Sequence, residues 1–331
     1  MMGIRAGFLP VTRQEMDALG WDCIDFLYVS GDAYVDHPSF AVSVITRVLT
    51  AAGYRVGIIS QPDWHSKEPF TVLGRPQYAV LIGAGNLDSM VAHYTAAKKR
   101  RSQDLYSPGG AAGKRPDRAT VVYANRVREA FPDIPIIIGG IEASLRRFAH
   151  YDYWQDKVRR SILLDSRADL LSYGMGEESI RQIADSLAAG CPIERLHHVR
   201  GTCYIAASTD DIQGEYLLLP SCEAVSTNKA QYAEAAKISF YEQDAVRGKT
   251  LVQAHGNRYV IQNPPMPPLS GKKLDEIYEL PYTRKAHPMY DALGGVPALS
   301  EVQFSITSSR GCFGSCNFCS LTFHQGRTVT A

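Results

Sequence analysis

Three cysteines lie within eight residues near the C-terminal end of the sequence. Cys312, Cys316 and Cys319 have the spacing C-x3-C-x2-C inside the stretch SSRGCFGSCNFCSLTFHQGR. Thiolates are soft ligands, which iron–sulfur clusters and zinc select. The remaining four cysteines are scattered along the chain, at Cys23, Cys191, Cys203 and Cys222. We interpret these four as inert thiols and the clustered three as metal ligands.

Three thiolates can hold three irons of a 4Fe–4S cubane and leave the fourth iron open. An open iron can bind the amino and carboxylate groups of S-adenosylmethionine (SAM). Electron transfer to its sulfonium would release a 5′-deoxyadenosyl radical, which no side chain can generate. Gly311 and Gly314 would let the loop wrap a cubane. Phe318, next to Cys319, either shields the cluster and lies near the adenine or only packs against its neighbours. No catalytic residue is predicted.

Zinc is the competing interpretation of the same residues. His324 lies five residues after Cys319, which completes a possible Cys3His site. The chain would then be a zinc-stabilised binding protein without enzymatic activity, whose basic loop Lys98–Arg118 contacts an anionic partner such as RNA. The spacing is unusual for zinc, and a predicted strand feeds the loop directly, so we favour the cluster.

The composition is that of an ordinary globular protein with a core. Of 331 residues, 45% are hydrophobic and 21% charged, and the formal net charge is +1. A global field that recruits nucleic acid or membrane is therefore excluded, although a local nucleic-acid contact stays open. No apolar run approaches the roughly 18 residues of a membrane span. The N-terminus lacks the apolar segment of a signal peptide, so we expect a cytoplasmic protein.

The first half of the sequence alternates short apolar runs with segments of helical period. This pattern predicts a parallel sheet covered by helices, in a doubly wound Rossmann-like α/β fold. The predicted strands are 23–31, 54–60, 77–85, 134–140 and 168–176. The predicted helices begin near 39, 119 and 177.

The second half is less regular. We expect a helix within 228–248, a hairpin over 251–265, a proline-rich connector over 263–271 and a short helix over 272–280. The alternating stretch 301–307 predicts a strand that enters the cysteine loop. We therefore predict three regions: a Rossmann-like domain 1–205, a helical and hairpin segment 206–300, and the start of a barrel at 301–331.

Three further stretches contain residues that could serve a function. Asp88 takes the third glycine position of a G-x-G-x-x-G-like stretch, which favours a helix N-cap over a nucleotide site. The loop Lys98–Arg118 is either a solvated surface loop or an anion-binding loop. Arg146 and Arg147 beside HYDYW either line a groove or are solvated next to a packed aromatic cluster.

The cysteine stretch and several others resemble the YgiQ-like radical SAM proteins. The matching stretches include QNPPMPPLS, LPYTRKAHP, IIIGGIEASLRRFAHYDYWQDKVRRSILLD, LLSYGMGE and YSPGGAAGKRPDRA. The resemblance covers nearly the whole chain. It implies a radical SAM enzyme with a cobalamin-binding-like Rossmann domain, a (β/α) barrel and cluster ligands at Cys312, Cys316 and Cys319. It also implies a small electron donor of the flavodoxin or ferredoxin type, and leaves the substrate unknown.

The sequence departs from the family pattern in two ways. Base-off cobalamin domains carry D-x-H-x-x-G after the first strand, where this chain reads GDAYVDHPSF. DWHSKE, over residues 63–68, follows the second strand instead, so cobalamin binding through a histidine is not expected. The later barrel strands are also missing, so we expect residues 1–331 to be a catalytically incompetent fragment of a longer protein.

Overall fold

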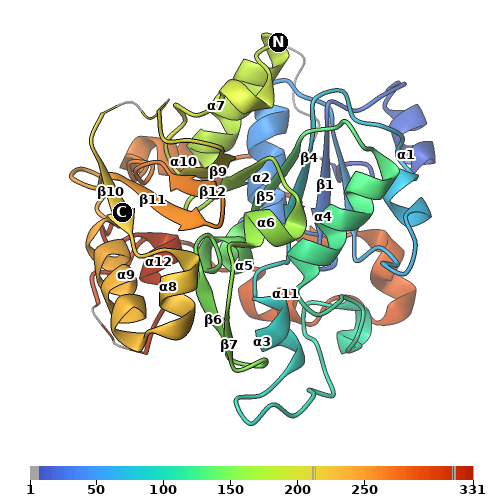
Figure 1. Cartoon of the computed structure of the whole chain (residues 1–331). Coiled ribbons are helices and arrows are strands. Elements are labelled where there is room, and N and C mark those ends of the chain that lie inside the picture. The colour runs from blue at the N-terminus through green and yellow to red at the C-terminus, as the bar shows by residue number, and fades with distance from the viewer. Residues whose placement is uncertain (1–6, 211, 213, 315, 317, 331) are drawn as a thin grey trace. The chain divides into compact units, whose positions relative to one another are not determined.

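The computed structural model describes residues 7–210, 212, 214–314, 316 and 318–330. Figure 1 shows the chain coloured by residue number, with its helices and strands labelled. The chain divides into two compact units, each made of two segments. Unit 1 contains residues 1–142 and 272–307, and unit 2 contains residues 143–271 and 308–331. These boundaries differ from the predicted regions 1–205, 206–300 and 301–331, which stay predictions.

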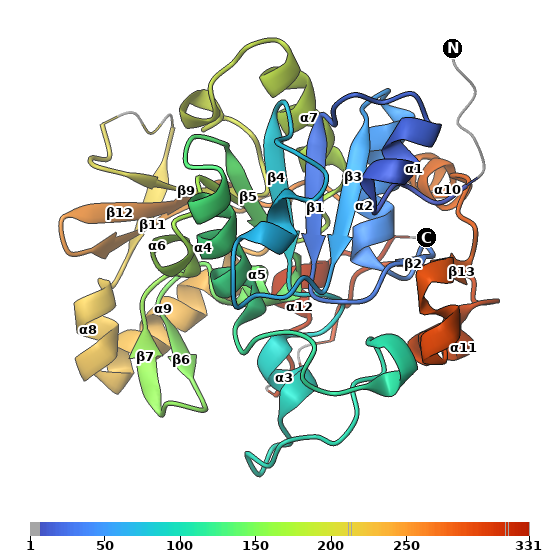
Figure 2. The same cartoon turned by 90° about the vertical axis from the view of Figure 1, so that its right-hand side faces the viewer.

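Four parallel strands form the centre of unit 1. They follow the order β3-β1-β4-β5 (Figure 2), with β1 at Phe26–Ser30, β3 at Val56–Ser60, β4 at Ala79–Gly83 and β5 at Ile136–Gly139. Every residue of β1 and β4 is buried. Continuous apolar strands of this kind occur where both faces of a parallel sheet are covered. The predicted α/β class with parallel strands is therefore confirmed.

The helices of unit 1 connect these strands. They include α2 (Ala41–Ala51), which packs on β1 and β3, and α4 (Ala119–Ala130), which packs on β4 and β5. The chain goes from β1 to β3 on one side and then to β4 on the other. The topological switch point of the sheet consequently lies between β1 and β4, where open α/β sheets bind ligands.

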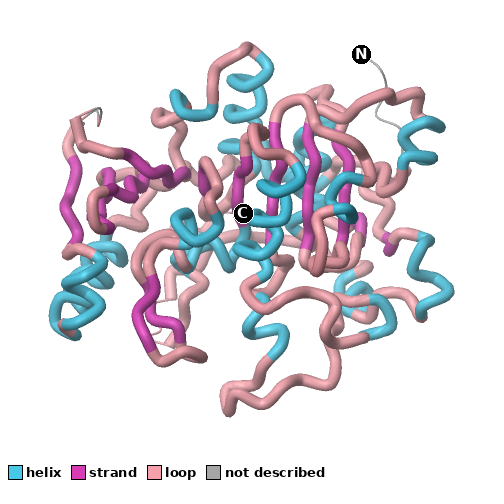
Figure 3. The backbone as a smooth tube through the Cα atoms, turned by 45° about the vertical axis from the view of Figure 1, so that its right-hand side comes forward, coloured by secondary structure: helices cyan, strands magenta, loops and turns pink. Residues whose placement is uncertain are grey.

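The other elements of unit 1 are short. They are α1 (Arg13–Ala18), β2 (Val35–Asp36), η1 (Glu68–Thr71), α3 (Ser89–His93), η2 (Pro108–Gly110), α10 (Gly271–Tyr278), β13 (Lys285–Ala286), η4 (Pro288–Leu293) and α11 (Ala298–Val302). Helix α5 (Gly140–Leu145) spans the division between the units. The segment from α3 to α4 is mostly loop (Figure 3). Asp104, Ser107 and Arg115 of this loop are buried.

Unit 2 contains five strands in the order β8-β9-β12-β11-β10. Their bounds are β8 (Leu170–Ser172), β9 (Thr202–Ala206), β10 (Tyr216–Leu219), β11 (Thr250–His255) and β12 (Arg258–Gln262). The β11–β12 hairpin confirms the predicted one, and Gly256 has φ +62° at its turn. The remaining elements are β6 (His150–Asp152), β7 (Lys157–Arg159), α6 (Ile162–Ser166), α7 (Glu177–Ala188), η3 (Ile193–Arg195), α8 (Cys222–Thr227), α9 (Lys229–Tyr241) and α12 (Thr322–Gln325).

The strand predicted over 301–307 is wrong. Helix α11 extends to Val302, and residues 303–307 form no strand. Phe304 and Ile306 are each 89% exposed. Alternation alone does not make a strand, because the backbone also needs a neighbouring strand to take its hydrogen bonds.

Helices throughout the described part of the chain are short. The longest, α9, has 13 residues. No helix among the described residues has the length and apolar character needed to span a bilayer.

Candidate functional site

The cysteine loop in unit 2 is closed by a short stem. Arg310 and Thr330 exchange two backbone hydrogen bonds of 2.9 and 3.0 Å, and the Cys312 amide donates to the Gly326 carbonyl at 3.1 Å. Gly311 has φ +88°, and a Cβ on it would lie 2.0 Å from the Thr328 carbonyl oxygen. Only glycine fits this stem position. The predicted role of Gly311 in wrapping a cubane stays a prediction.

Two of the three clustered cysteines are open to solvent. Cys312 and Cys316 are exposed and Cys319 is half-buried. A Cβ on Gly314 would lie 3.2 Å from Cys312 Sγ and 3.7 Å from Cys316 Sγ, so two sulfurs flank this glycine. In the described ranges, no three His, Cys, Asp or Glu side chains are grouped to hold a metal. The Phe318 side chain is 92% exposed, so its predicted contact with a cofactor stays a prediction.

His324 is half-buried and contacts Ser144. Its Nδ1 lies 2.9 Å from Ser144 Oγ, which also accepts a hydrogen bond from the Gly174 amide at 3.2 Å. Burial, with smaller contributions from Arg147 and Arg310, lowers the pKa of His324 to about 4. The imidazole is therefore neutral at pH 7. The contact with Ser144 engages the Nδ1 nitrogen of the ring.

Arg147 donates hydrogen bonds to the same segment. Nε donates to Gln262 Oε1 at 2.5 Å, and Nη1 donates to the carbonyls of Ser144 at 2.6 Å and Phe323 at 3.1 Å. Its guanidinium also stacks 4.6 Å from the centre of the Tyr173 ring. The side chain is buried, so the solvated position considered from the sequence is wrong for Arg147.

The other end of the loop is held by an ion pair. Arg310 Nη1 pairs with the buried carboxylate of Glu177 at the start of α7, and lies 3.8 Å from Met175 Sδ. The sequence places Glu177 at a strand end, but nothing in it indicates a partner 133 residues away. The loop is thus anchored on both sides of the three cysteines.

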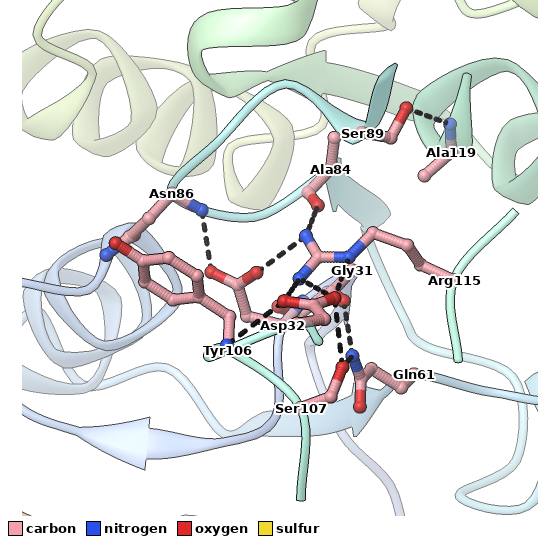
Figure 4. Close-up of polar contacts among 12 residues, drawn as sticks. Gly31, Asp32, Gln61, Ala84, Asn86, Ser89, Tyr106, Ser107, Arg115 and Ala119 are labelled. Carbon is pink, nitrogen blue, oxygen red and sulfur yellow. Dashed lines mark hydrogen bonds and ion pairs between the residues drawn. The ribbon is translucent and has the colours of Figure 1, made fainter. Parts of the chain in front are cut away.

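A second polar cluster occupies the switch point of unit 1 (Figure 4). Asp32 follows β1 and accepts a hydrogen bond from the Asn86 amide at 2.6 Å. Its other oxygen lies 2.7 Å from Arg115 Nη1, which also donates to the Ala84 carbonyl at 2.9 Å. Burial raises the pKa of Asp32 to about 6, although the charge of Arg115 opposes this shift.

Asp104 completes the neutralisation of Arg115. The guanidinium donates to both Asp104 oxygens, at 3.0 Å from Nε and 3.1 Å from Nη2. Ser107 Oγ donates to Asp104 at 3.0 Å and accepts from Gln61 Nε2 at 2.7 Å. Charged and polar side chains from three loops therefore fill the edge of the sheet.

The backbone also closes this edge. The Gly31 amide donates to the Gly83 carbonyl at 3.0 Å, and a Cβ on Gly31 would lie 2.0 Å from the Ala84 oxygen. The loops after β1 and β4 touch directly, so only glycine fits at position 31.

The loop Lys98–Arg118 was predicted to be either a solvated surface loop or an anion-binding loop. Neither prediction includes the part of the loop that is buried. Residues 98–103 are exposed, whereas Asp104, Ser107 and Arg115 are buried. Sequence reasoning missed the Asp32–Arg115 pair because its partners are far apart and follow no periodic pattern.

The histidines of the two stretches compared with D-x-H-x-x-G differ in exposure. His37 is buried, with Nδ1 accepting from the Ser39 amide at 3.0 Å and Nε2 lying 3.3 Å from the Gln303 carbonyl oxygen. His65 is exposed and pairs with Asp63 at 2.6 Å. Both nitrogens of His37 are thus used within the fold.

Two acidic residues cap helices. Asp88 accepts from the amides of Met90 and Val91, which confirms its predicted N-cap role. Glu142 is buried and accepts from the Ser89 amide at 2.8 Å and from the Thr120 amide at 3.0 Å. Because these amides begin α3 and α4, Glu142 stabilises the first turns of two neighbouring helices.

The sequence matches the Radical SAM N-terminal family over residues 8–305. A UPF0313 protein of Clostridium botulinum (strain ATCC 19397 / Type A) is 60% identical over 322 residues, which are 97% of this chain and 50% of that protein. A UPF0313 protein of Clostridium perfringens (strain 13 / Type A) is 56% identical over 98% of this chain and 49% of its own length. The chain therefore spans about half the length of these curated relatives.

A weaker likeness exists among solved structures. The radical SAM methyltransferase TsrM from Kitasatospora setae, with tryptophan and a SAM analogue bound, aligns with a TM-score of 0.37 and 19% identity. The alignment covers 54% of this chain and 28% of that one. Because the family match covers most of the sequence, the expected relationship to radical SAM proteins is confirmed, and the chain belongs to the Radical SAM N-terminal family.

Proposed function

We propose that this chain is part of a radical SAM enzyme in which Cys312, Cys316 and Cys319 hold a 4Fe–4S cluster. The observation that carries the proposal is the exposed loop on which the sulfurs of Cys312 and Cys316 flank Gly314. Membership of the Radical SAM N-terminal family supports it. The substrate and the outcome of the reaction are left open.

The donor set suits a cluster better than zinc. Three thiolates match a cubane with one open iron, whereas a structural zinc site needs a fourth ligand. The candidate for that ligand, His324, is half-buried, with its Nδ1 2.9 Å from Ser144 Oγ. Exposed thiols on a closed stem leave room for a bulky inorganic group.

When bound, the cluster would supply the electron that cleaves the C–S bond of SAM. The chain's own part is to hold and shield. The three thiolates would anchor three irons and leave one corner for the amino and carboxylate groups of SAM. Phe318, which is 92% exposed, would cover this corner and exclude water from it.

We also propose that unit 1 is a Rossmann-like domain whose switch point is closed to cobalamin. The ion pairs of Arg115 with Asp32 and Asp104 fill that edge, and Gly31 contacts Ala84 directly. Addition of hydroxocobalamin to the protein should leave the visible spectrum of the cofactor unchanged. A stoichiometric spectral change that is lost in Arg115→Met would contradict this part.

Two further parts of the proposal concern the cell. The enzyme would receive its electron from a small donor protein of the flavodoxin or ferredoxin type, and it would act in the cytoplasm. Cross-linking to a reduced flavodoxin, followed by measurement of the electron-transfer rate, tests the first of these.

Anaerobic reconstitution of the full chain with iron and sulfide tests the central proposal. We expect a brown protein with about four irons and four sulfides per chain. Cys316→Ala should lose this cluster, whereas Cys191→Ala, which removes a cysteine outside the cluster motif, should keep it. A colourless protein that binds one zinc tightly would favour the zinc-stabilised alternative instead.

A further inference from the structure

The cysteine loop is anchored at two points that bracket its three thiols. Glu177 pairs with Arg310, two residues before Cys312. Arg147 donates to the carbonyl of Phe323, four residues after Cys319. The cysteines therefore lie on a segment whose two ends are tied to the same unit.

The groups that contact the Arg147 guanidinium are neutral, which is unusual for a buried arginine. Among the described residues its contacts are a side-chain amide, two backbone carbonyls and two aromatic rings, and none is a carboxylate. Burial lowers the pKa of Arg147. Burying a cation without a counter-ion is costly, so such a residue needs an explanation.

An anionic group on the neighbouring loop would provide one. Thiolates and the cluster they hold form an anion, and reduction adds one more negative charge. Four residues of chain span at most about 14 Å, which limits the backbone distance from Phe323 to Cys319. Inside a protein, charges at such distances still interact.

We propose that Arg147 is a positioning residue that holds the loop after Cys319 and stabilises the reduced cluster by its unpaired charge. The electron would come from the reduced donor protein, and no bond to Arg147 forms or breaks. This inference rests on the proposed function.

Hydrogen exchange of the metal-free full chain tests the positioning role. In Arg147→Gln, the amides of residues 322–326 should exchange at least tenfold faster than in the wild type. Arg181→Gln removes an exposed arginine of the same unit and should leave them unchanged. Equal exchange in all three proteins would overturn the positioning role.

The midpoint potential of the reconstituted cluster tests whether the charge of Arg147 stabilises the reduced form. Arg147→Lys keeps the charge and should retain a potential close to that of the wild type. In Arg147→Gln the equilibrium constant for reduction should fall about tenfold, which is 59 mV for one electron. Unchanged potential in Arg147→Gln, or an equal shift in both variants, would overturn the electrostatic role.

The two measurements separate this inference from the proposed function. If the wild type takes up no cluster, the proposed function fails and the electrostatic role fails with it. The exchange of residues 322–326 in the metal-free protein still decides whether Arg147 holds the loop. If Arg147→Gln does not fold, Arg147→Lys serves for the exchange measurement, because a single ammonium group cannot reproduce the forked contacts.

Discussion

The buried arginines Arg115 and Arg147 differ in the groups that contact their guanidinium. Arg115 in unit 1 lies between the carboxylates of Asp32 and Asp104. Arg147 in unit 2 has neutral acceptors and aromatic faces, without a carboxylate in the described part of the chain. The first guanidinium is neutralised by its own unit, whereas the second keeps its charge.

The two regions differ in whether the chain itself neutralises their buried charge. The switch point of unit 1 is where an α/β sheet collects ligands, yet here it is filled by the chain itself. The cysteine loop has the opposite character, with Cys312, Cys316 and Phe318 exposed. Arg147, which donates to this loop, has no carboxylate partner among the described residues. We infer that the cysteine loop binds an additional group, the proposed cluster, whereas the switch point of unit 1 binds none.

The largest effect is expected from Arg115→Met. This change leaves two buried carboxylates without a counter-ion, so the free energy of unfolding should fall by about 3–5 kcal/mol. Urea denaturation measures this loss. Arg13→Met, which removes an exposed ion pair with Asp17, should cost less than about 1 kcal/mol. Similar losses in the two variants would mean that the switch-point network is not structural.

The pH dependence of the cysteine region should follow His324. Burial is the largest cause that lowers its pKa to about 4. The unfolded chain therefore binds this proton more tightly than the folded chain. Stability is therefore lost as pH falls from about 6.5 to 4, by up to about 3 kcal/mol. The metal-free protein should show this loss relative to His324→Gln. Parallel pH profiles of the two proteins would rule it out.

The switch point should show the opposite sign. Because burial raises the pKa of Asp32 to about 6, the folded chain binds this proton more tightly than the unfolded chain. Its contribution to stability is present below about pH 4 and is lost as pH rises to about 6, by up to about 3 kcal/mol. The free energy of unfolding of the wild type, minus that of Asp32→Asn, should fall as pH rises from about 4 to 6. A rise of this difference over the same range would refute the prediction.

A smaller loss is expected from Arg147→Met. The change removes three hydrogen bonds, but it also removes the cost of burying an unpaired charge. The free energy of unfolding should fall by about 1–3 kcal/mol, less than for Arg115→Met. Urea denaturation of both variants in one buffer makes the comparison. A larger loss at Arg147 than at Arg115 would reverse our interpretation of the two sites.

The smallest effect is expected from Ser144→Ala. It removes the partner of His324 Nδ1 and should destabilise residues 322–326 locally by about 1–2 kcal/mol. Hydrogen exchange of these amides measures the change. Ser226→Ala removes an exposed hydroxyl on α8 and serves as the control. Exchange that is unaltered by Ser144→Ala would show that this contact does not hold the loop.

The sequence predicted features that depend on local patterns. The strands β1, β3, β4 and β5 are apolar runs, and the hairpin turns at a glycine. The strand over 301–307 was wrong because alternation says nothing about a pairing partner. The Arg115 network and the anchoring of Arg310 by Glu177 were missed, since both join residues far apart in the chain.

In the proposed arrangement, three thiolates hold a cubane and leave one iron open. Its most direct test is the electron paramagnetic resonance spectrum of the dithionite-reduced, reconstituted protein, recorded with and without SAM. We expect a signal from a 4Fe–4S cluster whose g values change when SAM binds the open iron. An identical spectrum in both samples, or a signal that survives replacement of all three cysteines by alanine, would contradict the claim.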